Sequence, residues 1–275
     1  MNAVTVATLN VWNTSGDWPA RRTVLRRELS GLAPDLITLQ ETVVTTDYDQ
    51  VRDILPPDYH VVHQRARHPN GQGVSTASRW PIGRVEEVDL QLTPRSGDFP
   101  CTALITEILA PPPIGRIWLA NHFPDWQLDH EAERRTQAVT TARILSALAA
   151  ETPGHVLVAG DFDAEPDADS IRFWTGKHVI DDVSVCYRDA WASTHPTDPG
   201  HTFVPDNPNS ADWDWPFRRI DYILVRCGAH GGPTLVIEDC RQILHQPHNT
   251  ASDHYGLAAV LRPPAARDTA QGSGN

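Results

Sequence analysis

The chain has 275 residues, of which 40% are hydrophobic, and a formal net charge of −12. The hydrophobic content is ample for a buried core, and neither a repeat nor a Gly/Ser linker divides the chain, so we expect a single domain over residues 1–262. The negative charge disfavours broad electrostatic capture of nucleic acid, because such binding depends on Lys and Arg that neutralise phosphates. An acidic protein can still bind nucleic acid through a local basic groove or through bound divalent cations.

The N-terminus and the lack of a stretch that could span a bilayer predict a cytoplasmic protein. Met1 leads directly into an apolar pattern without the composition of a signal peptide, and no later stretch is long enough to span a bilayer. We therefore expect no membrane anchor, and we expect a monomer. Residues 263–275 are rich in Ala, Gly and Ser and predict a disordered tail. The cysteines form no CxxC pair, which favours reduced, mostly buried thiols over a disulfide or a zinc site. They are Cys101, Cys186, Cys227 and Cys240.

The first predicted element in chain order is a strand over residues 4–9 that ends at Asn10. A helix follows over residues 17–32, with a capping Asp before it and Pro in its first turn. A second strand, over residues 35–40, leads into Glu41. Shorter strands follow at hairpin-like intervals over residues 59–63, 73–78, 85–92, 103–109 and 114–120, the last of which leads into Asn121 and His122.

The longest helix candidate covers residues 129–149, where apolar side chains form one stripe. It leads into a strand over residues 156–160, and a short helix is predicted over residues 169–175. The remaining strands cover residues 220–225, 234–238 and 255–261. Two strand-rich halves, each with covering helices, predict a layered α/β sandwich with antiparallel pairing in mixed sheets.

The strand over residues 156–160 is followed by an unusual cluster of acidic residues. Five carboxylates occupy nine positions, and they repel one another unless a cation or a metal-bound phosphate neutralises them. They are Asp161, Asp163, Glu165, Asp167 and Asp169. A calcium-binding EF-hand loop is excluded, because Pro166 and Arg172 stand where that loop needs Gly and Glu. A phosphatase of the haloacid dehalogenase type fits weakly, since Thr or Val is usual at position 165. A metal-dependent phosphoesterase fits best.

Further polar residues stand at the ends of other predicted strands, each beside an apolar run, so they can converge at one edge of a sandwich. With the acidic strand end they are Asn10, Glu41, His122, Asp161, Asp163, Asp221, Asp253 and His254. The local motifs are Thr8-Leu9-Asn10, Leu39-Gln40-Glu41, Ser78-Arg79-Trp80-Pro81-Ile82, Asn121-His122, Gly160-Asp161-Phe162-Asp163, Arg219-Ile220-Asp221-Tyr222 and Ser252-Asp253-His254. In this order they resemble the endonuclease/exonuclease/phosphatase superfamily, and the resemblance extends from residue 8 to about residue 261.

The resemblance implies the fold of DNase I and a metal site. The fold would be an α/β (α+β) four-layer sandwich, in which two mixed, mainly antiparallel sheets pack face to face with helices outside. Asn10 and Glu41 would hold Mg²⁺, with Mn²⁺ as a possible substitute, and Asp253 would complete the site.

The resemblance also implies catalytic roles for the remaining residues. Asp161 would align or deprotonate the attacking water, and His254 would contact the phosphate or serve as the base, so two candidates for the base stay open. Asp221 would hold the His254 imidazole in the useful tautomer. His122 would be a phosphate contact or an acid near the leaving group. Such a hydrolase acts by in-line attack of water without a covalent intermediate.

Asp163 departs from the family pattern, which commonly has Asn at this position as a hydrogen-bond donor to the phosphate. An ionised carboxylate can only accept hydrogen bonds. Asp163 is therefore protonated, or bridged to the phosphate by a second cation, or set back while Arg or His donates instead. The neighbouring carboxylates Glu165 and Asp167 favour the second cation.

The substrate stays open among nucleic-acid phosphodiesters, phospholipid headgroups and small phosphoesters. Aromatic residues after strand ends predict either walls for a base, lipid or sugar, or plugs that hold loops on the core. The candidate substrate-binding residues are Arg79, Trp126, Trp213, Trp215 and Arg218. The alternative to a hydrolase is a catalytically idle phosphate-binding module of the same fold, but such a module has no need for two histidines and an Asp221 partner.

Overall fold

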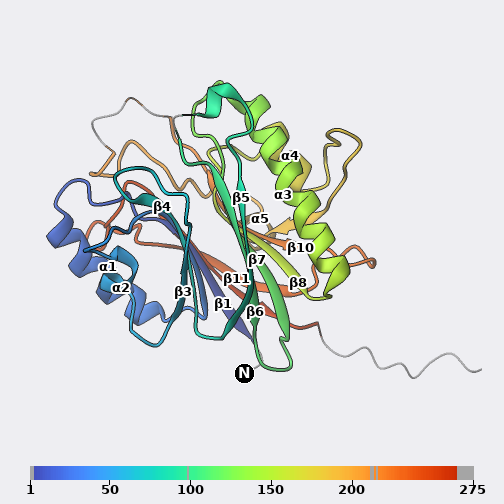
Figure 1. The fold of residues 1–275 in the computed structure, drawn as a ribbon, viewed down its shortest axis with the longest axis horizontal. Helices are drawn as coiled ribbons and strands as arrows, with labels where there is room; N and C mark the ends of the chain where they lie inside the picture. The colour runs from blue at the N-terminus through green and yellow to red at the C-terminus, as the bar shows by residue number, and fades with distance from the viewer. Residues whose placement is uncertain (1–2, 98, 211–213, 215, 265–275) are drawn as a thin grey trace, which may run out of the picture.

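The structure is a computed structural model, and it describes residues 3–97, 99–210, 214 and 216–264. Two six-stranded sheets lie next to each other in the centre of the molecule, and helices cover their outer sides (Figure 1). Within the described ranges, no helix is both long and apolar enough to cross a membrane. Trp213, Trp215 and residues 265–275 of the predicted tail lie outside the described residues.

The first sheet combines strands from both ends of the chain in the order β11-β12-β1-β2-β4-β3. The strand β1 pairs in parallel with β2 and antiparallel with β12. The N-terminal and C-terminal parts of the chain therefore meet in one sheet. The strands are β1 (Val4–Asn10), β2 (Leu36–Val43), β3 (His60–His63), β4 (Gln72–Ser78), β11 (Val236–Ile243) and β12 (Gly256–Arg262).

The second sheet comes from the middle of the chain in the order β5-β6-β7-β8-β10-β9. Only the pair β7 and β8 is parallel among its described strands, and α3 provides the crossover between them. The strands are β5 (Ile82–Asp89), β6 (Thr102–Leu109), β7 (Arg116–Phe123), β8 (His155–Asp161), β9 (Tyr187–Asp189) and β10 (Asp221–Arg226).

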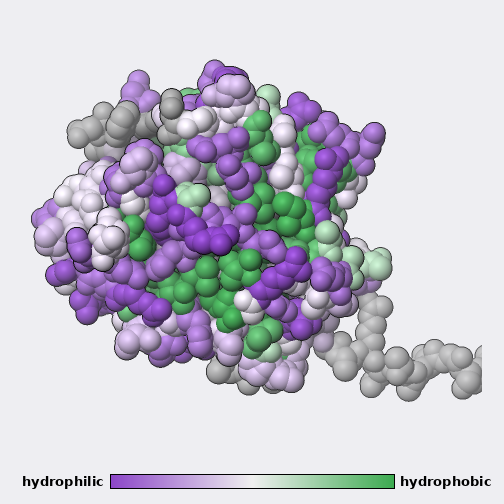
Figure 2. Space-filling view, in the orientation of Figure 1, coloured by the Kyte–Doolittle hydropathy of each residue, from purple (hydrophilic) through white to green (hydrophobic). Residues whose placement is uncertain are grey.

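The helices complete four layers. Leu25 and Leu29 of α1 pack with α2 on the outer face of the first sheet, and Ala138 and Leu145 of α3 pack with α4 on the outer face of the second. A third apolar cluster fills the space between the sheets. The helices are α1 (Trp18–Leu32), α2 (Gln50–Ile54), α3 (Glu131–Glu151), α4 (Asp169–Trp174), α5 (Ala190–Thr194) and the 3-10 helix η1 (Pro94–Ser96). Figure 2 shows the molecule in the orientation of Figure 1. The face toward the viewer is hydrophilic around its margin, with apolar residues nearer the middle.

The predicted fold class is confirmed, with one difference in how the chain builds it. The two sheets are mixed and mainly antiparallel, as expected. They do not correspond to the two halves of the chain, however, because β11 and β12 return to the first sheet. β12 pairs with β1, more than 200 residues away in sequence, so local patterns carry no information about that pairing.

The prediction of mostly buried thiols holds for two of the four cysteines. Cys101 and Cys240 are buried, whereas Cys186 is exposed and Cys227 is partly exposed. Cys186 directly precedes β9 and Cys227 directly follows β10, and these two strands pair. Residues that are distant in sequence are therefore neighbours at the edge of the second sheet.

Candidate active site

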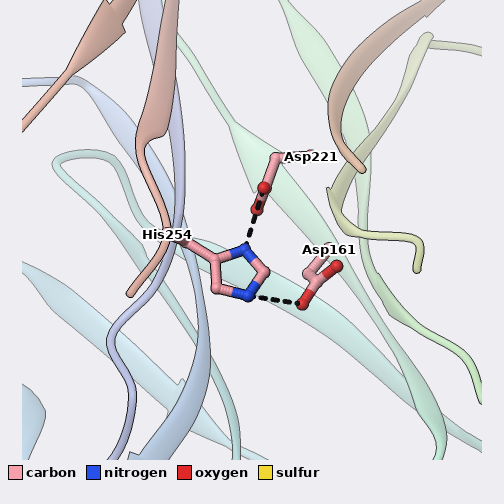
Figure 3. A group of neighbouring side chains, drawn as sticks. All are labelled: Asp161, Asp221 and His254. Atoms are coloured by element: carbon pink, nitrogen blue, oxygen red, sulfur yellow. Dashed lines mark hydrogen bonds and ion pairs between the residues drawn. The ribbon is translucent and has the colours of Figure 1, made fainter. Parts of the chain in front are cut away.

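A histidine between two aspartates lies where strands of both sheets meet. His254 precedes β12, Asp221 begins β10 and Asp161 ends β8 (Figure 3). The Nδ1 atom of His254 lies 3.0 Å from Oδ2 of Asp221, and its Nε2 atom lies 3.7 Å from Oδ2 of Asp161. The two aspartates face each other in the antiparallel pair of β8 and β10. All three side chains are buried, so their geometry is held by the surrounding sheet.

Asn10, at the end of β1, connects this group to Glu41. Its Nδ2 atom donates to Oε1 of Glu41 and to Oδ2 of Asp161, both at 3.0 Å. Its Oδ1 atom accepts from the backbone N–H of Trp12 at 2.9 Å, so the amide nitrogen faces the carboxylates. Asn13 donates to the second carboxylate oxygen of Glu41 at 3.2 Å. Asn10 was expected to be a metal ligand. In this orientation its side-chain amide instead links Glu41 to Asp161 through hydrogen bonds.

Irregular backbone at Glu41 and Asp163 directs their side chains toward the edge of the sandwich where the site lies. Glu41 has a φ of 57° where the pairing of β2 with β4 shifts register, and such a bulge re-aims a side chain. Asp163 has a φ of 50°, and its N–H donates to Oδ1 of Asp161 at 3.1 Å. Ser252 donates to the backbone carbonyl of Asn10 at 2.7 Å and thereby ties the loop before β12 to β1.

Burial and charge shift the pKa values of the central pair in useful directions. Burial raises the pKa of Asp161 to about 6, although His254 partly offsets the effect. Burial alone would lower the pKa of His254, but the charges of Asp221, Asp161 and Asp253 outweigh it and raise that pKa well above its usual value. Near neutral pH, His254 is therefore a charged imidazolium beside the weakly basic carboxylate of Asp161.

Glu41 and Asp253 are two further carboxylates beside this group, and the charge of Glu41 acts on Asp253. Burial raises the pKa of Glu41. Burial also raises the pKa of Asp253 to about 6, and the charge of Glu41 adds to the shift. Carboxylates that are desolvated and repel each other are stabilised by a cation, and Mg²⁺ prefers such oxygens. Among the described residues, the three-residue group with metal-ligand spacing is Asp161, Asp221 and His254, whose ligand atoms lie within 4.8 Å of one another.

Asp163 faces a guanidinium group. The Nη1 atom of Arg218 lies 4.0 Å from Oδ1 of Asp163, and its Nη2 atom donates to the Asp163 backbone carbonyl at 2.8 Å. Burial, together with the charge of Asp161, raises the pKa of Asp163 well above its usual value. Glu165 and Asp167 are exposed, and no described group with metal-ligand spacing includes Asp163. The described residues therefore do not support the prediction of a second cation beside Asp163. The guanidinium of Arg218 lies beside this carboxyl group instead.

A cleft of about 210 Å³ opens beside these groups. Of the predicted substrate-binding residues, Trp126 and Arg218 line it, whereas Trp213 and Trp215 lie outside the described residues. Arg79 follows β4 at the opposite end of the sheet, where it donates to the hydroxyl of Tyr59 at 3.4 Å. The structure therefore does not bring Arg79 to the cleft. The lining residues are Glu41, Phe99, Trp126, Asp161, Asp163, Phe203, Arg218, Ile220 and His254.

His122, expected near the leaving group, is not among the residues that line the cleft. It is 1% exposed, its Nδ1 lies 3.3 Å from the hydroxyl of Thr141 on α3, and its ring packs against Phe162 and Trp174. Burial lowers its pKa to about 3. Side chains alternate along a strand, and Asn121 already points between the sheets, where it bonds to β2, so the next residue faces the helix layer.

Several residues that support the site have no clear sequence signal. Thr202 accepts from the backbone N–H of Asp221 at 3.2 Å. Asn207 donates to the backbone carbonyls of Ser252 and Asp253 at 2.9 and 3.0 Å. Thr202 and Asn207 lie in irregular segments, where hydrophobic periodicity cannot point to them. Asn-Pro at position 207 predicts only a turn.

The family model places this two-sheet sandwich, with the acid–histidine–acid group at its edge, among phosphoester hydrolases. The model of the Endonuclease/Exonuclease/phosphatase family matches residues 7–254, so the chain belongs to that family. No curated protein sequence matches the chain.

Solved structures share the fold at low sequence identity. The human Nocturnin catalytic domain with bound sulfate anion has a TM-score of 0.73 at 15% identity, covering 95% of each chain. The endonuclease/exonuclease/phosphatase from Bacteroides vulgatus has a TM-score of 0.72 at 18% identity, covering 96% of this chain and 100% of that one. D. rerio TDP2 complexed with single strand DNA product has a TM-score of 0.68 at 16% identity, covering 94% and 99%.

Proposed function

We propose that this protein hydrolyses a phosphoester by in-line attack of a water molecule, with Mg²⁺ as its cofactor and Mn²⁺ as a possible substitute. The observation that carries the proposal is the buried group of Asp161, His254 and Asp221, which adjoins Glu41 at the wall of one cleft. Such a reaction requires a base, a positive charge that contacts the phosphate, and oxygen ligands for a metal ion. We propose Asp161, His254 and the carboxylates around Glu41 for these three roles.

In this proposal Asp161 is the general base and His254 binds the phosphate. A base must be able to accept a proton, and the carboxylate of Asp161, with its pKa raised to about 6, can do so near neutral pH. His254 is already protonated under these conditions, because three acids surround it. Its Nδ1 is occupied by Asp221, so Nε2 is the atom that donates to a phosphoryl oxygen and stabilises developing charge.

Glu41 and Asp253 would hold the cation, and Asn10 would set the spacing of Glu41 and Asp161. Bound Mg²⁺ polarises the phosphoryl group and neutralises charge in the transition state. His254 cannot act as a ligand to the same cation while it is charged and hydrogen-bonded to Asp221. For this reason we place the cation at the carboxylates beside it.

The walls of the cleft favour a substrate that has an aromatic ring next to its phosphate, and we propose a nucleic-acid phosphodiester. Phe99, Trp126 and Phe203 line the cleft, and Trp126 is 43% exposed, so its ring is available for stacking. Arg218 lies in the same cleft as a cation for the phosphate. The single strand DNA product bound by D. rerio TDP2, which has the same fold, supports this class of substrate.

A substrate panel with metal titration tests the proposal. Single-stranded and duplex DNA, RNA, a bis-aryl phosphate, an aryl monophosphate and a phosphoinositide are incubated with pure protein in Mg²⁺, Mn²⁺ or EDTA. We expect cleavage of single-stranded DNA with either metal and none in EDTA. His254→Ala should lower kcat/KM about 1000-fold, because it removes a charged contact to the transition state. The exposed histidine variant His60→Ala is the matched control and should retain full activity.

The panel also separates the competing possibilities. Preference for the phosphoinositide or the monophosphate would refute the nucleic-acid substrate but keep the hydrolase. Lack of cleavage of every substrate with every metal would refute the hydrolase and support a phosphate-binding module.

A further inference from the structure

Two thiols at the edge of the second sheet lie within reach of each other. The backbone N–H of Cys227 donates to the carbonyl of Cys186 at 2.9 Å, which extends the pairing of β9 with β10 by one residue. The two Sγ atoms are 3.5 Å apart. A disulfide bond is about 2.05 Å long, so these are separate thiols that a small side-chain rotation would bring to bonding distance.

The position of the pair makes it accessible from solvent. β9 is the last strand of its sheet, Cys186 is exposed and Cys227 is partly exposed. The two remaining cysteines, Cys101 and Cys240, are buried. A small oxidant in solution therefore reaches one pair of thiols first, and each member has a partner sulfur beside it.

We propose that Cys186 and Cys227 are a site of reversible oxidation, which forms a disulfide on reaction with a small-molecule disulfide. The thiolate of the exposed Cys186 attacks the small molecule, forms a mixed disulfide and releases one thiol. Cys227, as thiolate, then attacks the sulfur of Cys186 and releases the second thiol. Two protein thiols are oxidised to one disulfide, and one small-molecule disulfide is reduced to two thiols that carry the two protons.

Surrounding groups assign the order of these two steps. Burial, reinforced by a hydrogen bond with Cys186, raises the pKa of Cys227 to about 11. A thiol with a raised pKa is a poor first nucleophile, but it can react with an adjacent mixed disulfide because proximity compensates. Gly176 lies next to the sulfur of Cys186, where an added Cβ would be 3.2 Å from that sulfur, so the missing side chain keeps space open beside the thiol.

Oxidation would close a loop that carries part of the cleft wall. The segment between the two cysteines contains Phe203, Arg218 and Asp221, which contribute to the site. The disulfide itself lies beyond the far end of β10 from Asp221, six residues or about 20 Å away. We therefore expect a bond that stabilises the fold of this segment without touching the reacting groups. A disulfide is a better interpretation of the two cysteines than a metal site, because no described group of three metal-ligand side chains includes either cysteine.

Oxidised and reduced glutathione at varied ratios test this proposal on the full chain. Intact mass under denaturing, non-reducing conditions should show loss of two hydrogen atoms after oxidation, and peptide mapping should join Cys186 to Cys227. The oxidised protein should melt roughly 5–15 °C higher than the reduced protein, because the bond closes a loop of about 40 residues. Dithiothreitol should reverse both changes, and kcat/KM of the two forms should agree within about twofold.

Single serine variants provide the controls. Cys186→Ser should abolish the loss of hydrogen and the rise in melting temperature, and so should Cys227→Ser, while both variants fold because Ser is close to Cys in size. The proposal is refuted if the wild-type protein gains two glutathione groups without a cross-link, or stays unmodified at every ratio. A cross-link that leaves the melting temperature unchanged would refute the stabilising effect. Links that involve Cys101 or Cys240 instead would contradict the assignment of the pair.

Discussion

One carboxylate and one guanidinium distinguish this site from the usual pattern of its family. The motif that the sequence resembles has Asn where Asp163 stands, and the resemblance implies that this Asn donates to the phosphate. The raised pKa of Asp163 favours its neutral form, which has a single O–H, whereas Arg218 lies 4.0 Å from it in the same cleft and carries only donors. We infer that the donor has moved from position 163 to position 218, and that Asp163 now orients the guanidinium.

This exchange predicts a coupled effect of two substitutions. Arg218→Ala should lower kcat/KM about 100-fold in the wild-type background, which is typical for loss of one donor to a transition-state oxygen. In the Asp163→Asn background an amide donor is restored, so the same Arg218→Ala change should cost less than about 10-fold. Steady-state kinetics on the best substrate of the panel, with all four proteins, measures the difference.

The free energy of unfolding of the same four proteins is the control. Arg218 also donates to the backbone of residue 163, so a purely structural pair would show the same coupling in urea unfolding. Equal losses of kcat/KM in the two backgrounds would exclude the transfer of the donor. A coupling that appears to the same extent in unfolding would assign the pair to stability.

At the scale of elements, most helices and strands were predictable, including the short β3 and α4, and three short elements were not. The helices α1 and α3 and the strands β1, β2, β8, β10 and β12 coincide with predicted segments to within three residues. The elements α2, β9 and α5 have at most five residues each, too few for a period to be recognised, and tertiary packing rather than local preference forms them. β9 matters most, because its pairing with β10 aligns Cys186 with Cys227.

The same distinction applies to the site. Asn10, Glu41, Asp161, Asp221 and His254 converge as expected. Four of them stand at or just before a strand end, Glu41 stands at the bulge near the end of β2, and the sandwich brings these positions to one edge. The position of His122 depended on which face of β7 points inward, and one residue of register decides this. No local pattern reports that register, since both Asn121 and His122 are polar.

The close contact of β7 with β8 makes Gly160 a sensitive position. A Cβ at residue 160 would lie 2.0 Å from the backbone carbonyl oxygen of His122, and pairing of Asn121 with Ala159 prevents the strands from separating. We predict that Gly160→Ala lowers the free energy of unfolding by about 3 kcal/mol or more, because backbone rather than a flexible side chain must move. It should also displace the next residue, Asp161, and lower kcat. Urea unfolding and kinetics measure the two effects.

A matched Gly→Ala change separates this clash from the general effect of glycine. Gly31 lies in α1, and an added Cβ there meets nothing within 4 Å. Gly31→Ala should therefore leave stability unchanged or raise it by up to about 1 kcal/mol. Similar stability of the two variants would show that β7 and β8 can separate at little cost.

For the whole molecule, buried titratable groups make opposing contributions to stability as pH changes. The pKa values of Asp161 and Asp253 are raised to about 6, so in the absence of metal their contribution is present below about pH 4 and is lost as pH rises through 6. The pKa of His122 is lowered to about 3. The folded protein thus binds fewer protons at His122 than the unfolded chain does between about pH 3 and 6.5, and stability from this group is lost as pH falls through that range.

The contribution of His122 can be isolated by comparing two pH values. Between pH 7.5 and pH 5.0, protonation of this histidine in the unfolded chain alone should lower the free energy of unfolding by about 2 kcal/mol. His122→Gln lacks the titrating group, so its free energy of unfolding should fall by about 2 kcal/mol less than that of the wild type over the same interval, whatever its absolute stability. Urea unfolding in EDTA at both pH values tests this, with the exposed His60→Gln as the control that keeps the wild-type difference. The same pH difference in wild type and His122→Gln would mean that His122 can become protonated within the folded protein, and hence that solvent reaches the layer between β7 and α3.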